Sequence, residues 1–341
     1  ERLGETGSHA PALALRCAAG ASAVEIDRAV VDGMESSVAR LIAGQPESED
    51  FVATEKLLHR SARKSGNIDS LKNWWLFRFL ETANPLAEKM TLLWHNHFAT
   101  SNVKVRSTEK MNTQHALLRW HALGNFADLF RALARDVAML MWLDGNANRK
   151  RHPNENFARE VMELFALGVG NYSESDIKEA ARAFTGWHVR NEEFWFNKVQ
   201  HDPGVKKVLG KSGKFKGDDI LEICLQHKAC ARFVASKLLS AFVQPNPGAA
   251  LLDALAARLR FHKFEIAPVM RELLSSQVFY ASESRRVIIK SPVELVVSTF
   301  RSLDGRAKLA ECVQLMSDLG QNLFEPPTVK GWEGGRLWIN S

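Results

Sequence analysis

The chain has 341 residues, of which 45% are hydrophobic and 25% are charged, and its formal net charge is +6. These proportions are typical of a globular protein and exclude a chain that is disordered throughout. No apolar run reaches the roughly 18 residues that a membrane-spanning helix needs, so no membrane span is expected. The two densest basic runs, at residues 149–152 and 206–216, are not interleaved with aromatic residues in the way that a single-strand stacking surface is, and a nucleic-acid partner is therefore not expected either.

Helix signals recur along the whole chain. Ser22 and Glu25 form a capping box, and Asn84 before Pro85 marks a second helix start. Apolar residues then recur three and four positions apart, which is the spacing of one face of an α-helix. The expected helices lie near residues 22–43, 50–64, 69–82, 84–94, 108–123, 126–133, 155–167, 174–184, 218–242, 249–261, 266–277, 292–303 and 307–319.

Two segments break this helical pattern. Residues 187–200 alternate aromatic and polar side chains around a polar turn, which predicts a small β-hairpin. Residues 320–341 are rich in Trp, Gly and Pro and predict an irregular C-terminal tail that wraps the helices. We find no internal repeat and no long linker. The predicted fold is therefore mainly α, a single-domain multi-helix bundle over residues 1–341, in which the helices of residues 22–82 could form a subdomain.

The cysteines are few and scattered. Cys224 and Cys230 lie close together in the sequence, and they could be two buried thiols or one disulfide bridge. No CxxC pair is present, which argues against a zinc site built from cysteines.

Four stretches of the chain carry a resemblance to a known family. They read WHNHF at residues 94–98, NENFARE at 154–160, HDPGVK at 201–206 and KGWEGG at 330–335. In this order they resemble the motifs of the bacterial domain of unknown function 1800 family, and further matches cover nearly the whole chain. The resemblance implies an exported protein, periplasmic or secreted, often encoded near a sulfatase-like partner protein. It implies no substrate and no mechanism.

His95 and His97 are candidate catalytic residues, because imidazole can change its charge near neutral pH. Residues two positions apart on a helix point in different directions, so both can bind one metal only if the helix has ended there. The alternative is that one histidine is packed or caps the helix and the other is merely polar.

The NENFARE stretch opens a helix with a polar face. Glu155, Arg159 and Glu163 follow one another at intervals of four, and Glu160 lies beside them. A buried carboxylate held by Arg159 would be a candidate acid or base, and Glu160 is the stronger candidate. Arg159 itself is a candidate for substrate binding. The alternative is a solvated face held by weak ion pairs.

The loop before this helix has the ligand spacing of a calcium-binding loop. Positions one, three, five and twelve are Asp144, Asn146, Asn148 and Glu155. Arg149 stands where such loops need glycine, and the neighbouring cations would repel Ca²⁺ or Mg²⁺. The alternative is that Asn154 caps the following helix.

His201, Asp202 and Lys206 form a polar loop cluster after the hairpin. The first two are candidates for acid–base work, and Lys206 could hold a carboxylate or sulfate group of a substrate. Neighbouring side chains usually diverge, so the alternative is a turn in which Asp202 bonds to its own backbone.

Tryptophan is unusually frequent, with nine residues against two tyrosines. Trp94, Trp187 and Trp332 are candidate platforms for a sugar ring, and the indole of Trp338 on the C-terminal tail could also stack on one. The alternative for those on irregular chain, which the flanking glycines favour, is that they attach that chain to the helical core.

Two functions remain open, and the sequence does not decide whether the protein is an enzyme. The first is an extracytoplasmic enzyme that acts on a polymer, expected to be a polysaccharide, by acid–base chemistry between histidines and carboxylates. The second is a non-catalytic binding or assembly module that works with a partner hydrolase. Both require that distant polar segments meet in one accessible hollow.

Overall fold

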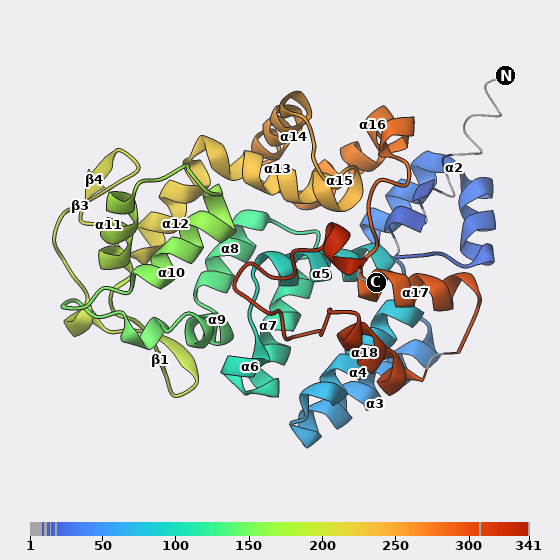
Figure 1. Ribbon diagram of the computed structural model, residues 1–341, viewed down its shortest axis with the longest axis horizontal. Coiled ribbons are helices and arrows are strands. Elements are labelled where there is room, and N and C mark those ends of the chain that lie inside the picture. Colours follow the sequence, from blue (N-terminus) through green and yellow to red (C-terminus); the bar gives the residue numbers. More distant parts are fainter. Residues whose placement is uncertain (1–8, 10–11, 14, 18, 307, 340–341) are drawn as a thin grey trace.

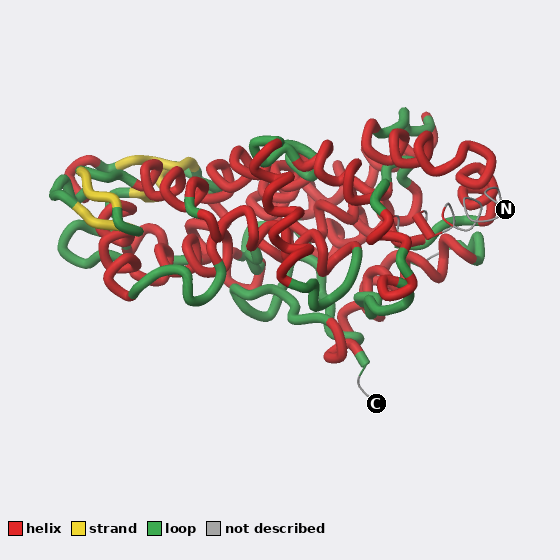
Figure 2. Tube along the Cα trace, turned by 90° about the horizontal axis from the view of Figure 1, so that it is seen from above, coloured by secondary structure: helices red, strands yellow, loops and turns green. Residues whose placement is uncertain are grey.

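The computed structural model describes residues 9, 12–13, 15–17, 19–306 and 308–339. Helices make up most of an elongated molecule, and the mainly α fold is confirmed (Figures 1 and 2). The helices are α2 (Ala23–Ala43), α3 (Glu49–Ser65), α4 (Ile68–Glu81), α5 (Pro85–His97), α6 (Asn102–Val105), α7 (Thr108–Trp120), α8 (Phe126–Ala134), α9 (Val137–Trp142), α10 (Glu155–Glu160), α11 (Glu174–Phe184), α12 (Gly217–Gln226), α13 (Lys228–Phe242), α14 (Ala249–Phe261), α15 (Ile266–Leu274), α16 (Gln277–Tyr280), α17 (Pro292–Ser302) and α18 (Leu309–Asp318).

Local capping signals explain most helix boundaries. The capping box at Ser22 is present, with reciprocal hydrogen bonds between Ser22 and Glu25. The expected helix 218–242 was wrong as one piece. It is divided into α12 and α13, because His227 adopts an extended conformation and caps α13 through its own ring nitrogen. Of the helix expected at 307–319, residue 307 lies outside the described residues.

The predicted hairpin is confirmed. Strands β1 (Trp187–Arg190) and β2 (Glu193–Phe196) pair antiparallel, with Trp187 opposite Phe196. Both turn residues, Asn191 and Glu192, have positive φ, as a two-residue hairpin turn of this hand requires. A second, shorter hairpin was not predicted. It joins β3 (Lys206–Val208) to β4 (Lys211–Gly213).

The N-terminal helices do not all pack together. Helix α3 lies against α4, and α4 also contacts α17 and α18 from the other end of the chain, around the buried Trp75. Helix α2 instead contacts α5 and α15. The larger core runs from α5 through α8 and α13 to α11, at the end of the molecule that carries the hairpins (Figure 1). The division into domains therefore stays a prediction.

The C-terminal tail is irregular, as predicted, apart from the short 3₁₀ helix Gly335–Trp338. It crosses the end of α5, where Asn96 accepts a hydrogen bond from the Trp332 backbone N–H and donates one to the Trp332 carbonyl (2.7 and 3.3 Å). Gly331 permits this contact. Its φ is +80°, and a Cβ there would lie 2.1 Å from Asn96 Oδ1.

The four cysteines are free and buried, so Cys224 and Cys230 are two thiols. Burial raises the pKa of the Cys230 thiol to about 12. None of the described helices is long and apolar enough to cross a membrane.

Candidate functional site

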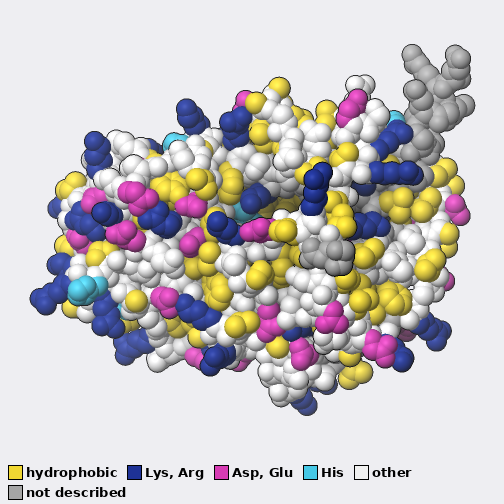
Figure 3. All heavy atoms as spheres, viewed as in Figure 1, with side chains coloured by type: hydrophobic (Ala, Val, Ile, Leu, Met, Phe, Trp, Pro, Cys, Tyr) yellow, Lys and Arg dark blue, Asp and Glu magenta, His cyan; other side chains and the backbone are white. Residues whose placement is uncertain are grey.

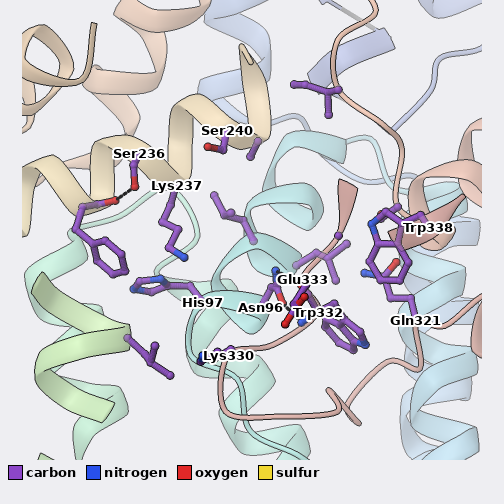
Figure 4. A pocket seen from close by; sticks show the side chains of 18 of the residues that line it. Asn96, His97, Ser236, Lys237, Ser240, Gln321, Lys330, Trp332, Glu333 and Trp338 are labelled. Carbon is purple, nitrogen blue, oxygen red and sulfur yellow. Dashed lines mark hydrogen bonds between the residues drawn. The ribbon is translucent and has the colours of Figure 1, made fainter. Parts of the chain in front are cut away.

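A groove of about 630 Å³ lies where five parts of the chain meet, and side chains that line it are shown in Figure 4. One wall is the C-terminal part of α5, and another is α13. The remaining walls are the segment after α10 and the C-terminal tail, with residues 288–294 closing one side. The groove thus brings the WHNHF motif, the segment that follows the NENFARE motif and the KGWEGG motif to one place.

The segment after α10 is a π-helix, Val161–Leu167. It ends at Gly168, as predicted, and the Gly168 N–H donates to the carbonyl of Glu163 five residues earlier (2.9 Å). Such wider turns are frequent at functional sites. Here the π-helix places Glu163 and Leu164 on the groove wall and leaves the Phe165 carbonyl free to accept a bond from α5.

His97 lines the groove as a neutral imidazole. Its Nε2 lies 3.0 Å from the Phe165 carbonyl oxygen, which can only accept, so Nε2 carries the proton. Burial, together with the positive charge of Lys237, lowers the pKa of His97 to about 3. A base this weak is poorly matched to proton transfer near neutral pH. The structure therefore makes His97 a wall residue whose donor is already engaged.

His95 points away from the groove, as the two-residue spacing predicted. Its ring packs against Trp75 and Trp332, and Nε2 has no hydrogen-bond partner among the described residues. Burial lowers the pKa of His95 to about 3. His95 does not line the groove, and its surroundings are those of a core residue.

His95 should make the protein sensitive to acid. In the unfolded chain this histidine has a pKa of 6.5, whereas in the folded protein its pKa is about 3 and it stays neutral. The free energy of unfolding therefore decreases as the pH falls between these two values. Between pH 7 and pH 5, replacing His95 with phenylalanine should reduce the loss in free energy of unfolding by about 2 kcal/mol. Urea unfolding at the two pH values measures this. The exposed His152→Gln serves as control, and equal pH dependence in all three proteins would contradict the prediction.

Glu163 is a carboxylate on the groove wall, and Glu160, three residues earlier, lies behind it outside the groove lining. Glu160 is 8% exposed, and burial, with the nearby charge of Glu163, raises its pKa. Glu163 accepts a hydrogen bond from the Tyr172 hydroxyl. Arg159, expected to hold one of them, instead forms a two-bond pair with Glu174 of α11 (2.8 and 2.6 Å). That expectation was wrong, because the Arg159 side chain is directed to the neighbouring helix.

Two lysines of the groove differ in their partners. Lys89 donates to Glu294 (2.8 Å) and to the Arg16 carbonyl (2.7 Å). Lys237 extends from α13 toward the ring of His97 (Figure 4), and its ammonium lies 4.9 Å from the centre of the Phe233 ring. It makes no ion pair with any described carboxylate.

The candidate tryptophans are mostly enclosed. Trp94 is fully buried and donates to the Ala122 carbonyl (2.9 Å), and Trp187 is buried between Phe184 and Phe194. These two have no face to offer a sugar, so their assignment to substrate binding was wrong. Trp332 lines the groove floor but is only 4% exposed, because it attaches the tail to α5. The more exposed Trp338 lies at the opposite end of the groove from Lys237 (Figure 4).

The loop with His201, Asp202 and Lys206 does not reach the groove. His201 Nδ1 lies 2.9 Å from the Thr185 carbonyl, and Asp202 pairs with Arg182 (2.8 Å) while accepting the Gly204 N–H. Lys206 is buried and donates to the carbonyls of Asp202 and Gly204. These bonds fold the loop against α11, and the expected meeting with the other histidines does not occur.

The oxygen-rich loop before α10 is held by protein donors. Asn146 Oδ1 accepts the Val189 N–H (2.6 Å), Asn148 Oδ1 accepts the Asn154 N–H (2.8 Å), and Asp144 pairs with Lys104 (2.8 Å). Glu155 lies in the first turn of α10, beyond the cap that Asn154 forms. In the part of the chain that the structure describes, no three His, Cys, Asp or Glu side chains gather as metal ligands. A cation would have to displace these donors.

Sequence reasoning missed Lys237 and Asn96 as groove residues and ranked Glu163 below Glu160, whereas Trp338 was among the tryptophans expected to offer a face to a sugar ring. Asn96 lies inside the WHNHF motif, between the two histidines that were the candidate catalytic residues. Lys237 could have been found from α13, where polar residues recur at helical spacing within an apolar helix.

Comparison with known proteins gives one match. A family model described as "Protein of unknown function (DUF1800)" matches residues 12–341. No curated protein and no solved structure matches the chain.

Proposed function

Because the chain belongs to the family described as "Protein of unknown function (DUF1800)", a description that states no activity, we propose its function from the groove. The protein is an extracytoplasmic enzyme that acts on a polymeric glycan. The observation that carries the proposal is a groove with a carboxylate, Glu163, on one wall and an indole, Trp338, at one end. Indole faces stack on sugar rings, and carboxyl groups transfer protons in glycoside hydrolysis.

The acid–base group of the proposal is the pair Glu160 and Glu163. A leaving glycosidic oxygen must gain a proton, and an attacking water must lose one. Burial raises the pKa of Glu160, so this carboxyl group keeps its proton to higher pH than an exposed one. Glu163 lines the groove and would contact the substrate, while Glu160 acts through it as a positioning residue. The neutral His97 and His95 are left out of proton transfer.

Glu163→Gln should lower the rate of polysaccharide cleavage about 100-fold or more, because the amide cannot exchange a proton. Release of reducing ends from a panel of neutral and acidic polysaccharides measures the rate. Glu160→Gln should slow the reaction and change its pH profile. The control is Glu109→Gln, an exposed carboxylate on α7, which should keep the wild-type rate. Cleavage that survives Glu163→Gln would refute the assignment.

The second candidate is the binding or assembly module, and one observation favours it. His201, Asp202 and Lys206, which resemble a family motif, are engaged in bonds that hold a loop to α11. Polysaccharide that is bound but never cleaved would support this function. So would a stable complex with a sulfatase-like protein encoded beside the gene, measured by gel filtration of the mixed proteins.

A further inference from the structure

We infer that Lys237 binds a carboxylate or sulfate group of the ligand, so that the polymer taken by this groove is an acidic glycan. The inference rests on the proposed function, because it assigns a substrate class to the same groove. It begins from one feature, a half-buried lysine on the groove wall that forms no ion pair with a described carboxylate.

Helix α13 presents Lys237 to the groove by its periodicity. The groove face repeats at helical spacing, and the other face is apolar and buried in the core. The groove side chains of α13 are Phe233, Ser236, Lys237, Ser240 and Ala241. The core therefore fixes the direction in which Lys237 points, and the side chain extends toward His97 (Figure 4).

Lys89 is a lysine of the same groove whose ammonium group does have hydrogen-bonding and anionic partners. It is held by Glu294 and by a backbone carbonyl, both within 2.8 Å. Lys237 lies beside the rings of Phe233 and His97 and has no described anionic partner, and burial lowers its pKa with no neighbouring charge opposing that effect. Removing a cation from water without a partner costs free energy that an anion would offset. A ligand oxyanion is the partner that this position lacks.

The rest of the groove argues for one anion at this place rather than for a polymer of high charge density. Three lysines and three glutamates line the groove, so their formal charges balance. Glu163 is bonded to Tyr172, Glu294 is paired with Lys89, and Glu333 is exposed on the tail. On the face in Figure 3, basic side chains are spread along the molecule with acidic ones among them. A chain with spaced carboxylates therefore fits better than a densely sulfated one.

The test is binding of polygalacturonate, dextran sulfate and neutral dextran, measured by affinity electrophoresis of the full protein. Lys237→Gln should weaken binding of the acidic polymer at least about tenfold and leave binding of dextran unchanged. Lys237→Arg keeps the charge and should retain most of the affinity. Lys228→Gln, on the same helix but exposed outside the groove, is the matched control. Melting temperatures show that the variants are folded.

The outcomes separate this inference from the proposed function. Lys237-dependent binding of polygalacturonate without cleavage would support the inference and leave the catalytic proposal refuted. Cleavage or binding of neutral dextran alone would overturn the inference and keep the glycan function. Equal binding of polygalacturonate by Lys237→Gln and the wild type would also overturn it. Preference for dextran sulfate that depends on Lys237 would assign sulfate as the anion.

Discussion

Replacing Glu88 with alanine is expected to lower the free energy of unfolding by about 3–5 kcal/mol, because the change removes the buried anion of Arg78 and leaves this arginine only the partly exposed Glu55 (3.2 Å). Glu88 is fully buried on α5 and accepts four hydrogen bonds. The donors are Trp75 Nε1, Arg78 Nε and Nη2, and Arg119 Nε, at 2.8–3.1 Å. The side chain of Arg78 is only 6% exposed. Since native proteins are stable by about 5–15 kcal/mol, this loss would be a large share.

Guanidinium unfolding followed by circular dichroism measures the effect. Glu88→Gln keeps the shape and part of the hydrogen bonding, and should fall between alanine and wild type. The matched control is Glu174→Ala, which also removes a carboxylate bonded twice to an arginine, but on the surface. Exposed ion pairs contribute little, so this variant should unfold near the wild-type midpoint. Equal losses at Glu88 and Glu174 would show that burial does not set the cost.

Local signals explain why so much of the fold could be predicted. Capping residues and apolar spacing lie within a few positions of each other, so Ser22 and Glu25 mark a helix whatever surrounds it. The same holds for the hairpin at Trp187, where alternation and the turn lie in one short stretch. The helix expected at 218–242 failed for a local reason too. His227 does not look like a helix breaker, and only its conformation in the structure reveals the boundary.

The groove could be predicted only in part, because its walls are far apart in the sequence. Asn96 and Trp332 are hydrogen-bonded although they lie 236 positions apart in the sequence. The residues next to either one do not indicate this contact. The motifs did indicate which segments matter, but not which side chains. His95 and His97 drew attention as titratable groups, yet burial makes both neutral. Lys237 was not a candidate from the sequence, because a lysine on a helix is ordinarily exposed to water.

The last expectation concerns the residue that lets the tail reach α5. Gly331→Ala should lower the free energy of unfolding by about 3 kcal/mol or more, for two reasons that add. A side chain at a φ of +80° costs about 1–2 kcal/mol, and the Cβ would lie 2.1 Å from Asn96 Oδ1 and 2.5 Å from the Asn96 carbonyl oxygen. The tail must then withdraw, which breaks both hydrogen bonds between Asn96 and Trp332.

Gly170→Ala separates the two reasons. Its φ is +85°, but no atom lies within 4 Å of an added Cβ, so only the backbone cost remains and the loss should be about 1 kcal/mol. Hydrogen exchange of residues 320–339 should rise in Gly331→Ala and stay unchanged in Gly170→Ala. Because Trp332, Trp338 and Lys330 all line the groove from the tail, glycan binding should weaken together with the exchange protection. If the two glycine variants lost equal stability, the close approach to Asn96 would not be what holds this wall of the groove in place.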